Sequence, residues 1–187
     1  TQMFDGCSNL TNLDVSNFNT SNVTTMSGMF SGCSNLTSLN VSHFNTSKVT
    51  SMSGMFSDCS NLTSLDVSHF NTDNVGSFPS DMNNMFFGCK SLTELDLSNF
   101  NTHKVTSMAA MFEGCSNLTS LNISNFNTIN VEYTWNMFKG CSKLSSLDLS
   151  NFKTFNVTSM SGMFSDCSNL TTLGLSNFDT SKVNSMR

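Results

Sequence analysis

The seven cysteines are the most reactive residues of this sequence, and they are evenly spaced. Five of the six gaps between them are 26 residues long and one is 30. If copies of a repeat stack about 4.8 Å apart, neighbouring thiols could be bridged, but an odd number cannot pair completely. Metal ligation is disfavoured because no histidine or carboxylate shares the column. We expect a ladder of buried, reduced thiols that behave as small apolar side chains, formed by Cys7, Cys33, Cys59, Cys89, Cys115, Cys141 and Cys167.

Histidines and carboxylates also recur at fixed positions. His43 and His69 occupy the same place in adjacent copies, but a zinc site needs three or four ligands, so the pair predicts neither a metal nor another cofactor. A second column, which we call the acidic ribbon, carries carboxylates in four copies: Asp14, Asp66, Asp96 and Asp148. The ribbon could meet a basic segment of a partner protein, a glycan or Ca²⁺. Alternatively, it is a solvated ladder in which intervening asparagines relieve like-charge repulsion.

Composition narrows the classes of function. The 187 residues carry a net charge of −5 and only 11% are charged, where about a quarter is typical. Without a basic stripe we expect no nucleic-acid binding, and no apolar run is long enough for direct membrane insertion. No nucleophile–base pair, glycine-rich phosphate loop or paired-carboxylate site stands apart from the repeat, so we expect no enzymatic activity.

One sequence motif is repeated along the whole chain. Met-Phe-x-x-Cys-Ser-x-Leu-Thr-x-Leu recurs seven times with small variations, and a fixed period in this range predicts a solenoid of stacked coils. Leu65 and Val67 alternate with polar residues and predict a short inward-facing strand. Met52, Met55 and Phe56 are spaced i, i+3, i+4 and predict a single helical or 3₁₀ turn. We expect the strands to form a parallel sheet and the connections to wind right-handed.

The repeat also sets the domain organisation. We expect one repeat domain over residues 1–187, with about seven coils near residues 3–28, 29–54, 55–84, 85–110, 111–136, 137–162 and 163–187. Both ends cut through a copy, and the polar caps that terminate solenoids are missing. We therefore expect the chain to be a fragment of a longer array.

Departures from the repeat are candidates for ligand binding, because stacking does not require them. Four extra residues create an insertion at residues 76–81, and insertions in repeat proteins map to loops, often on a binding face. A second departure places large apolar residues where other copies carry mostly small or polar ones. The predicted contact residues are Phe78 in the insertion, and Ile129, Tyr133, Trp135 and Phe155 in the second group. Exposed aromatic side chains of this kind anchor interfaces; the alternative is an irregular coil.

The repeat resembles a known family. Leu-x-x-Leu-x-Leu followed by a bulky inward residue is the leucine-rich-repeat pattern, and Val-Thr-Ser-Met-x-x-Met-Phe-x-x-Cys-Ser-x-Leu-Thr-x-Leu is similar to the 26-residue subgroup of BspA-like leucine-rich repeats in bacterial surface proteins. The resemblance implies an extracellular or bacterial cell-surface location. It also implies adhesion to a host matrix protein, to epithelial or microbial surfaces, or to a glycan. Two other functions stay open: a purely structural stalk, or a surface that binds ice or another crystal.

Overall fold

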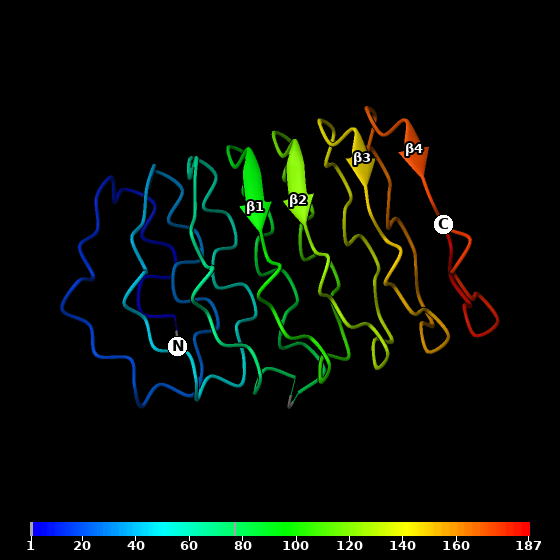
Figure 1. Ribbon diagram of the computed structural model, residues 1–187. Helices are drawn as coiled ribbons and strands as arrows, with labels where there is room; N and C mark the ends of the chain where they lie inside the picture. The colour runs from blue at the N-terminus through cyan, green and yellow to red at the C-terminus, as the bar shows by residue number, and fades with distance from the viewer. Residues whose placement is uncertain (1, 77) are drawn as a thin grey trace.

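Successive copies of the repeat lie side by side in a stack with the two termini at opposite ends (Figure 1). The computed structural model describes residues 2–76 and 78–187. Backbone bonds join equivalent places in neighbouring copies: Phe30 N donates to Met55 O at 3.0 Å, and Phe112 N donates to Met137 O at 2.9 Å. The 26-residue period is therefore the step from one layer of the stack to the next. The right-handed winding and the number of coils stay predictions.

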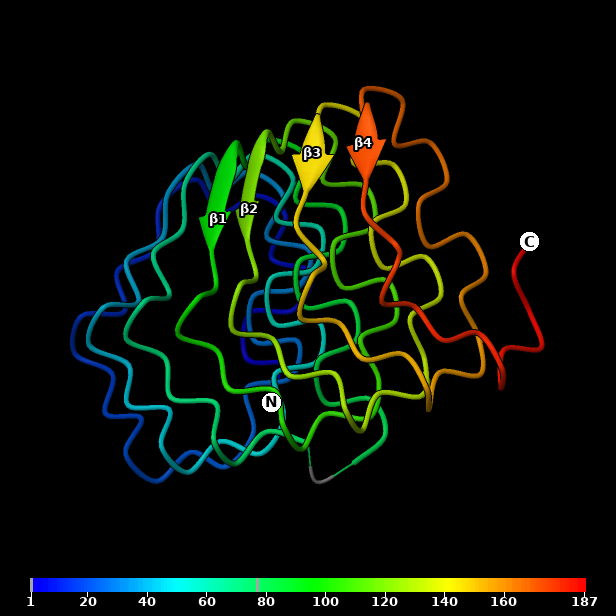
Figure 2. The same ribbon diagram turned by 45° about the vertical axis from the view of Figure 1, so that its right-hand side comes forward.

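Four short strands lie in chain order along one side of the stack (Figures 1 and 2). They are β1 (Glu94–Asp96), β2 (Ser120–Asn122), β3 (Ser146–Leu147) and β4 (Thr172–Leu173). β1 pairs with β2 in parallel, and β3 pairs with β4 in the same way. The parallel arrangement matches the expectation from the sequence.

The prediction of a strand at Leu65 and Val67 is wrong, although this segment occupies the same repeat position as β1. Residues 59–70 carry no strand assignment. The clearest backbone link to the preceding copy there is Thr63 N to Thr37 O, at 3.2 Å. Val67 is nevertheless buried, because the inward position depends on the course of the coil rather than on regular ladder bonds.

The predicted helical turn is also wrong: within the described residues no helix occurs. The segment is instead a run of β-turns, in which Met55 N donates to Met52 O at 3.1 Å and Cys59 N donates to Phe56 O at 3.2 Å. The third residue of each turn is left-handed, with φ of 58° at Gly54 and 55° at Asp58. A left-handed residue breaks a helix, and glycine adopts that conformation at little cost.

A column of stacked phenylalanine rings fills the interior. The rings of Phe4, Phe30, Phe56, Phe86, Phe112, Phe138 and Phe164 follow one another with centroids 5.6–5.8 Å apart and planes within 11° of parallel. Beside it, the thiols of the six cysteines from Cys33 to Cys167 each donate to the phenylalanine carbonyl of the preceding copy, as in Cys115 Sγ to Phe86 O at 3.1 Å. The five middle cysteines are buried, and all seven are free thiols. The predicted ladder of reduced thiols is confirmed.

A column of threonines clamps neighbouring copies together. Thr102 Oγ1 donates to Asn127 O at 2.9 Å and accepts a bond from Asn127 N at 2.7 Å. The same pair of hydrogen bonds recurs at five other junctions, at Thr20, Thr46, Thr72, Thr128 and Thr154. These threonines are all buried, so their hydroxyls hold the backbone and do not form an exposed face.

Candidate functional site

Four large apolar side chains are exposed on two neighbouring copies. Ile129, Tyr133, Trp135 and Phe155, which we call the aromatic sidewall, are 38–43% exposed. In most other copies the same positions carry serine, threonine or another polar residue. The structure therefore places all four predicted residues of this group at the surface.

Bonds on both sides of Ile129 and Phe155 place the two residues next to each other. Before them, Thr128 Oγ1 donates to Lys153 O at 3.0 Å and accepts from Lys153 N at 2.7 Å. After them, Asn156 Nδ2 donates to Ile129 O at 2.9 Å. These flanking contacts place Ile129 and Phe155 at neighbouring positions of adjacent copies.

Tyr133 and Trp135 face outward because Thr134 between them faces inward. Thr134 takes the place of the buried methionine of other copies, is itself buried, and donates from Oγ1 to Ser159 O at 3.3 Å. The backbone of Tyr133 forms parallel β-bridges with Ser107 of the preceding copy and with Ser159 of the following copy.

The preceding copy lies directly beside the two aromatic residues. Trp135 O accepts a bond from Ala110 N at 2.9 Å, which fixes the Trp135 backbone against that copy. Ser107 and Ala109 are there only 3% and 0% exposed, whereas Ser51 and Ser53 at the same repeat positions are half-buried. The two aromatic residues therefore stand beside two buried residues of the preceding copy, Ser107 and Ala109.

Phe78 lies apart from the aromatic sidewall. It is the most exposed large apolar residue of the described chain, at 64%, and belongs to the copy at 55–84. Residues 85–110 separate that copy from the one that carries Ile129. The buried Asp81 closes the loop, since Phe78 N donates to Asp81 Oδ2 at 2.5 Å. The predicted insertion at 76–81 includes Ser77, which lies outside the described residues.

The acidic ribbon lies on the strand side of the stack. Each carboxylate accepts a bond from the backbone of the serine two residues on, as in Ser68 N to Asp66 Oδ1 at 2.9 Å, with the same bond at Asp14, Asp96 and Asp148. These bonds hold the pKa of each of the four carboxyls below its ordinary value of 3.8. The ribbon is therefore negatively charged at neutral pH.

A shallow hollow of about 520 Å³ crosses the ribbon, with Asp66, Asp96 and Glu94 in its lining. Glu94 was missed from the sequence, because in other copies its position carries serine, threonine or asparagine. Within residues 2–76 and 78–187 no group of three or more histidine, cysteine or acidic side chains is arranged to hold a metal ion.

The side chains of His43 and His69 each form a hydrogen bond to the backbone of the preceding copy. Nε2 of His43 donates to Val15 O at 2.7 Å, and Nε2 of His69 donates to Val41 O at 2.8 Å. Asn99 fills the same repeat position in another copy and donates to Val67 O at 3.1 Å. The imidazoles thus replace asparagine as clamps between copies, and their bonded nitrogens face backbone carbonyls.

Comparison with known proteins identifies the family. The family described as "Mycoplasma protein of unknown function, DUF285" matches residues 1–80 and 80–187, nearly the whole chain. The chain belongs to the DUF285 family. A comparison with curated proteins gave no match.

Solved structures similar to this DUF285 chain include bacterial leucine-rich-repeat proteins. A leucine-rich-repeat protein from Eubacterium ventriosum matches with a TM-score of 0.50 at 18% identity, over 83% of this chain and 43% of that one. A leucine-rich cell surface protein from Faecalibacterium prausnitzii gives 0.48 at 20% identity, over 84% and 36%. A leucine-rich-repeat protein from Bacteroides ovatus gives 0.41 at 22% identity, over 85% and 44%.

The similarity to the Eubacterium ventriosum structure confirms the predicted leucine-rich-repeat solenoid fold. This DUF285 chain spans less than half the length of each of these three neighbours. Among the residues that the structure describes, no helix is long and apolar enough to cross a membrane.

Proposed function

We propose that this DUF285 chain is a binding module of a bacterial cell-surface or secreted protein, and that the aromatic sidewall contacts a protein or glycan ligand. The observation that carries the proposal is the exposure of Ile129, Tyr133, Trp135 and Phe155 on two adjacent copies. Stacking does not require large apolar residues there, since other copies do without them. Exposed Trp and Tyr are the residue types that dominate binding energy at interfaces.

The sidewall combines aromatic rings with hydrogen-bonding neighbours. Ser159 stands beside Tyr133 in the ladder, and Ser161 and Asn136 adjoin Trp135 through the bond from Asn136 N to Ser161 O, at 2.8 Å. Tyr and Trp supply a large contact area with few rotatable bonds, while serine and asparagine supply adaptable polar contacts. Host matrix proteins, epithelial or microbial surface proteins and glycans all suit such a surface.

A structural stalk is the second candidate function. It is favoured by the regularity of the other copies, whose columns of phenylalanine, cysteine and threonine serve stacking alone. Ice or crystal-surface binding has weaker support, because the regular threonine column is buried and its hydroxyls are bonded to backbone.

The test is adhesion of beads coated with this chain to cultured epithelial monolayers and to a glycan array. We expect the double variant Trp135→Ser, Phe155→Ser to lose at least about tenfold in bead retention, as the loss of two hot-spot residues implies. Phe78→Ser, which removes an exposed aromatic residue outside the sidewall, is the matched comparison: a smaller loss than in the double variant assigns the main contact to the sidewall, and an equal or larger loss assigns it to the predicted insertion residue. Equal retention by the double variant, with an unchanged circular dichroism spectrum, would reject the sidewall and favour the stalk.

A further inference from the structure

Lys153 departs from the repeat at a position beside the aromatic sidewall. The other copies carry asparagine or aspartate at this position: Asn19, Asn45, Asn71, Asn101, Asn127 and Asp179. In each of these copies the side-chain oxygen accepts a bond from the backbone two residues on, as in Ile129 N to Asn127 Oδ1 at 3.1 Å. Lysine has no acceptor, so its copy gives up this turn bond. Stacking of the copies therefore does not require the lysine.

The amino group of Lys153 has no partner in the part of the chain that the structure describes. The one ion pair found there joins Lys139 to Glu113. Asp179, at the same repeat position in the next copy, uses its carboxylate to accept a bond from Ser181 N at 2.8 Å. Lys153 is itself exposed. Its charge is therefore available to a ligand.

Lys153 lines a shallow hollow of about 450 Å³ between the copies at 111–136 and 137–162. Ile129 of the sidewall belongs to the same lining, together with the side chains of Asn125, Asn127 and Asn151. Among the described lining residues, Lys153 alone carries a charge. The volume lies in the range of small-ligand sites, about 300–1,000 Å³. The hollow thus joins the sidewall to a polar surface with one positive charge.

The asparagines of the hollow offer both a donor and an acceptor. Oδ1 of Asn127 accepts the bond from Ile129 N, which also settles which atom of that amide is the oxygen. Nδ2 of Asn127 makes no bond to the described residues, so it is a free donor. Nδ2 of Asn125 donates to Ser98 O, which leaves Oδ1 as an acceptor. Lys153 and Asn127 can therefore donate to an anionic group, and Asn125 can accept from a hydroxyl.

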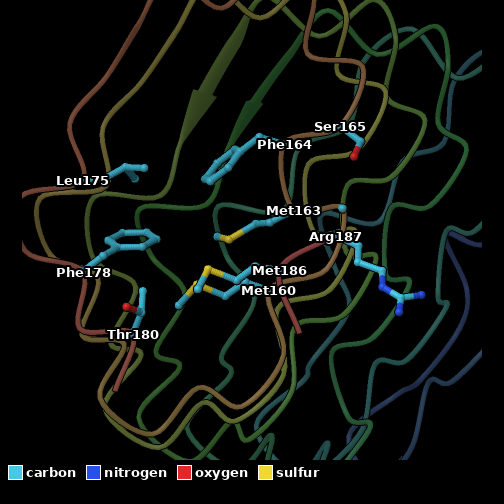
Figure 3. Close-up of a pocket in the computed structure, with 10 residues that line it drawn as sticks. Met160, Met163, Phe164, Ser165, Leu175, Phe178, Thr180, Met186 and Arg187 are labelled. Atoms are coloured by element: carbon cyan, nitrogen blue, oxygen red, sulfur yellow. The ribbon is translucent and has the colours of Figure 1, made fainter. Parts of the chain in front are cut away.

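Two other hollows lack this combination of groups. The hollow across the acidic ribbon is lined by Asp66, Asp96 and Glu94, so it disfavours anions. The hollow at the last layer is lined by side chains of the core columns, such as Met163 and Phe178, which point into the inside of the coil (Figure 3). These side chains serve the packing of the interior. The hollow beside Lys153 is the one that pairs a free cation with free amide groups.

We propose that the hollow beside Lys153 binds an anionic sugar of a glycan, one that carries a carboxylate or a sulfate, while the aromatic sidewall contacts the sugars next to it. This inference rests on the proposed function and names the ligand class. The anionic group accepts bonds from Lys153 Nζ and Asn127 Nδ2, and a hydroxyl of the sugar donates to Asn125 Oδ1. The acidic side chain of a peptide would fill little of the hollow and would leave the Asn125 acceptor unpaired.

Isothermal titration calorimetry of the purified chain with defined oligosaccharides tests the proposal. The anionic probes are hyaluronan, which carries carboxylates, and heparin, which carries sulfates as well. Chitin oligosaccharides share the N-acetylglucosamine of hyaluronan without its charge, and poly-glutamate carries carboxylates without sugar. We expect at least one anionic glycan to bind about tenfold or more tighter than chitin oligosaccharides and poly-glutamate. The tighter of the two anionic glycans identifies the anion that the hollow prefers.

Two variants test the donors of the hollow. Lys153→Met removes the charge, keeps the length of the side chain and should raise the dissociation constant of the anionic glycan about tenfold. Lys143→Met removes an exposed lysine of the same copy outside the hollow and should bind as the parent does. Asn127→Asp keeps an acceptor for Ile129 N, as Asp179 does in its own turn, but places a carboxylate beside Lys153. It should abolish binding of the anionic glycan and leave the circular dichroism spectrum unchanged.

Several results would overturn the anionic sugar. They are no binding of either anionic glycan, equal binding of hyaluronan and chitin oligosaccharides, and an unchanged dissociation constant in Lys153→Met. Tighter binding of poly-glutamate than of both glycans would assign the hollow to an acidic peptide instead. The variant Trp135→Ser, Phe155→Ser separates this inference from the proposed function. If that variant loses adhesion while Lys153→Met binds as the parent does, the sidewall stands and the anionic sugar is rejected; if neither variant loses binding, both are rejected.

Discussion

Removing one ring from the middle of the phenylalanine column should destabilise the chain far more than removing an exposed ring. Phe112 is fully buried, and its ring lies 5.8 Å from that of Phe86 and 5.6 Å from that of Phe138. Phe112→Ala opens a cavity that neighbouring layers cannot fill, because each layer is fixed by its own bonds to the next. Such substitutions cost about 3–5 kcal/mol, of which each lost aromatic pair accounts for about 0.5–1.5 kcal/mol.

Two matched variants separate column position from ring chemistry. Phe4→Ala removes a ring of the same column at the end of the stack, where only Phe30 lies next to it in the column, so we expect about half the loss of Phe112→Ala. Phe155→Ala removes a ring of the exposed sidewall and should cost about 1 kcal/mol or less.

Urea unfolding measures these differences. Circular dichroism reports the whole stack, and the fluorescence of Trp135, the single tryptophan, reports the copy that contains Phe112. With a urea dependence of about 2 kcal/mol per molar, typical for a chain of this kind, Phe112→Ala should lower the midpoint by about 1.5–2.5 M. A shift no larger than that of Phe155→Ala would show that the rings do not form a continuous packed column.

Two further predictions concern polar groups of the interior. Thr102→Val removes a hydroxyl that both donates to and accepts from the Asn127 backbone and should cost about 2–4 kcal/mol in urea unfolding, whereas Thr119→Val, at an exposed hydroxyl, should cost about 0.5 kcal/mol or less; equal losses would contradict the clamp. Burial raises the pKa of the Cys59 and Cys115 thiols from 9.0 to about 12, with the charge of Cys33 adding to the rise at Cys59. Because the folded pKa lies above the unfolded one, the stabilisation is complete below pH 9 and is lost as the pH rises toward 12. The urea midpoint should therefore fall over that range, and should fall less steeply in Cys59→Ala, Cys115→Ala; an identical pH dependence in that variant would contradict burial of the two thiols.

The inward columns could be predicted from the sequence because they depend only on the period. Met52, Met55 and Phe56 are all fully buried as expected, although the backbone that carries them is a run of turns and not a helix. The i, i+3, i+4 spacing is the same in both cases, so apolar pattern alone does not distinguish them. The distinguishing signal was the position of Gly54, which is glycine or asparagine in five of the seven copies, since these residues tolerate positive φ.

The candidate site was predictable only as departures from the repeat. The sequence indicated that Trp135 faces outward, because serine occupies its position in three other copies, and its exposure agrees. It also indicated that Phe78 lies apart from the other aromatic residues, because the insertion at 76–81 belongs to the copy at 55–84. The clamp made by His43 was missed: histidine and asparagine share a position there because both have an N–H that reaches the Val15 carbonyl or its counterpart.

The central claim is that each 26-residue block forms one layer and places its cysteine in a common interior column. Alkylation of the native chain with N-ethylmaleimide, followed by peptide mass spectrometry over time, measures this for each thiol. We predict that Cys7 and Cys167 react rapidly and that Cys33, Cys59, Cys89, Cys115 and Cys141 react only after unfolding in urea. Modification of the middle thiols at the rate of Cys7 in the native chain would contradict the account.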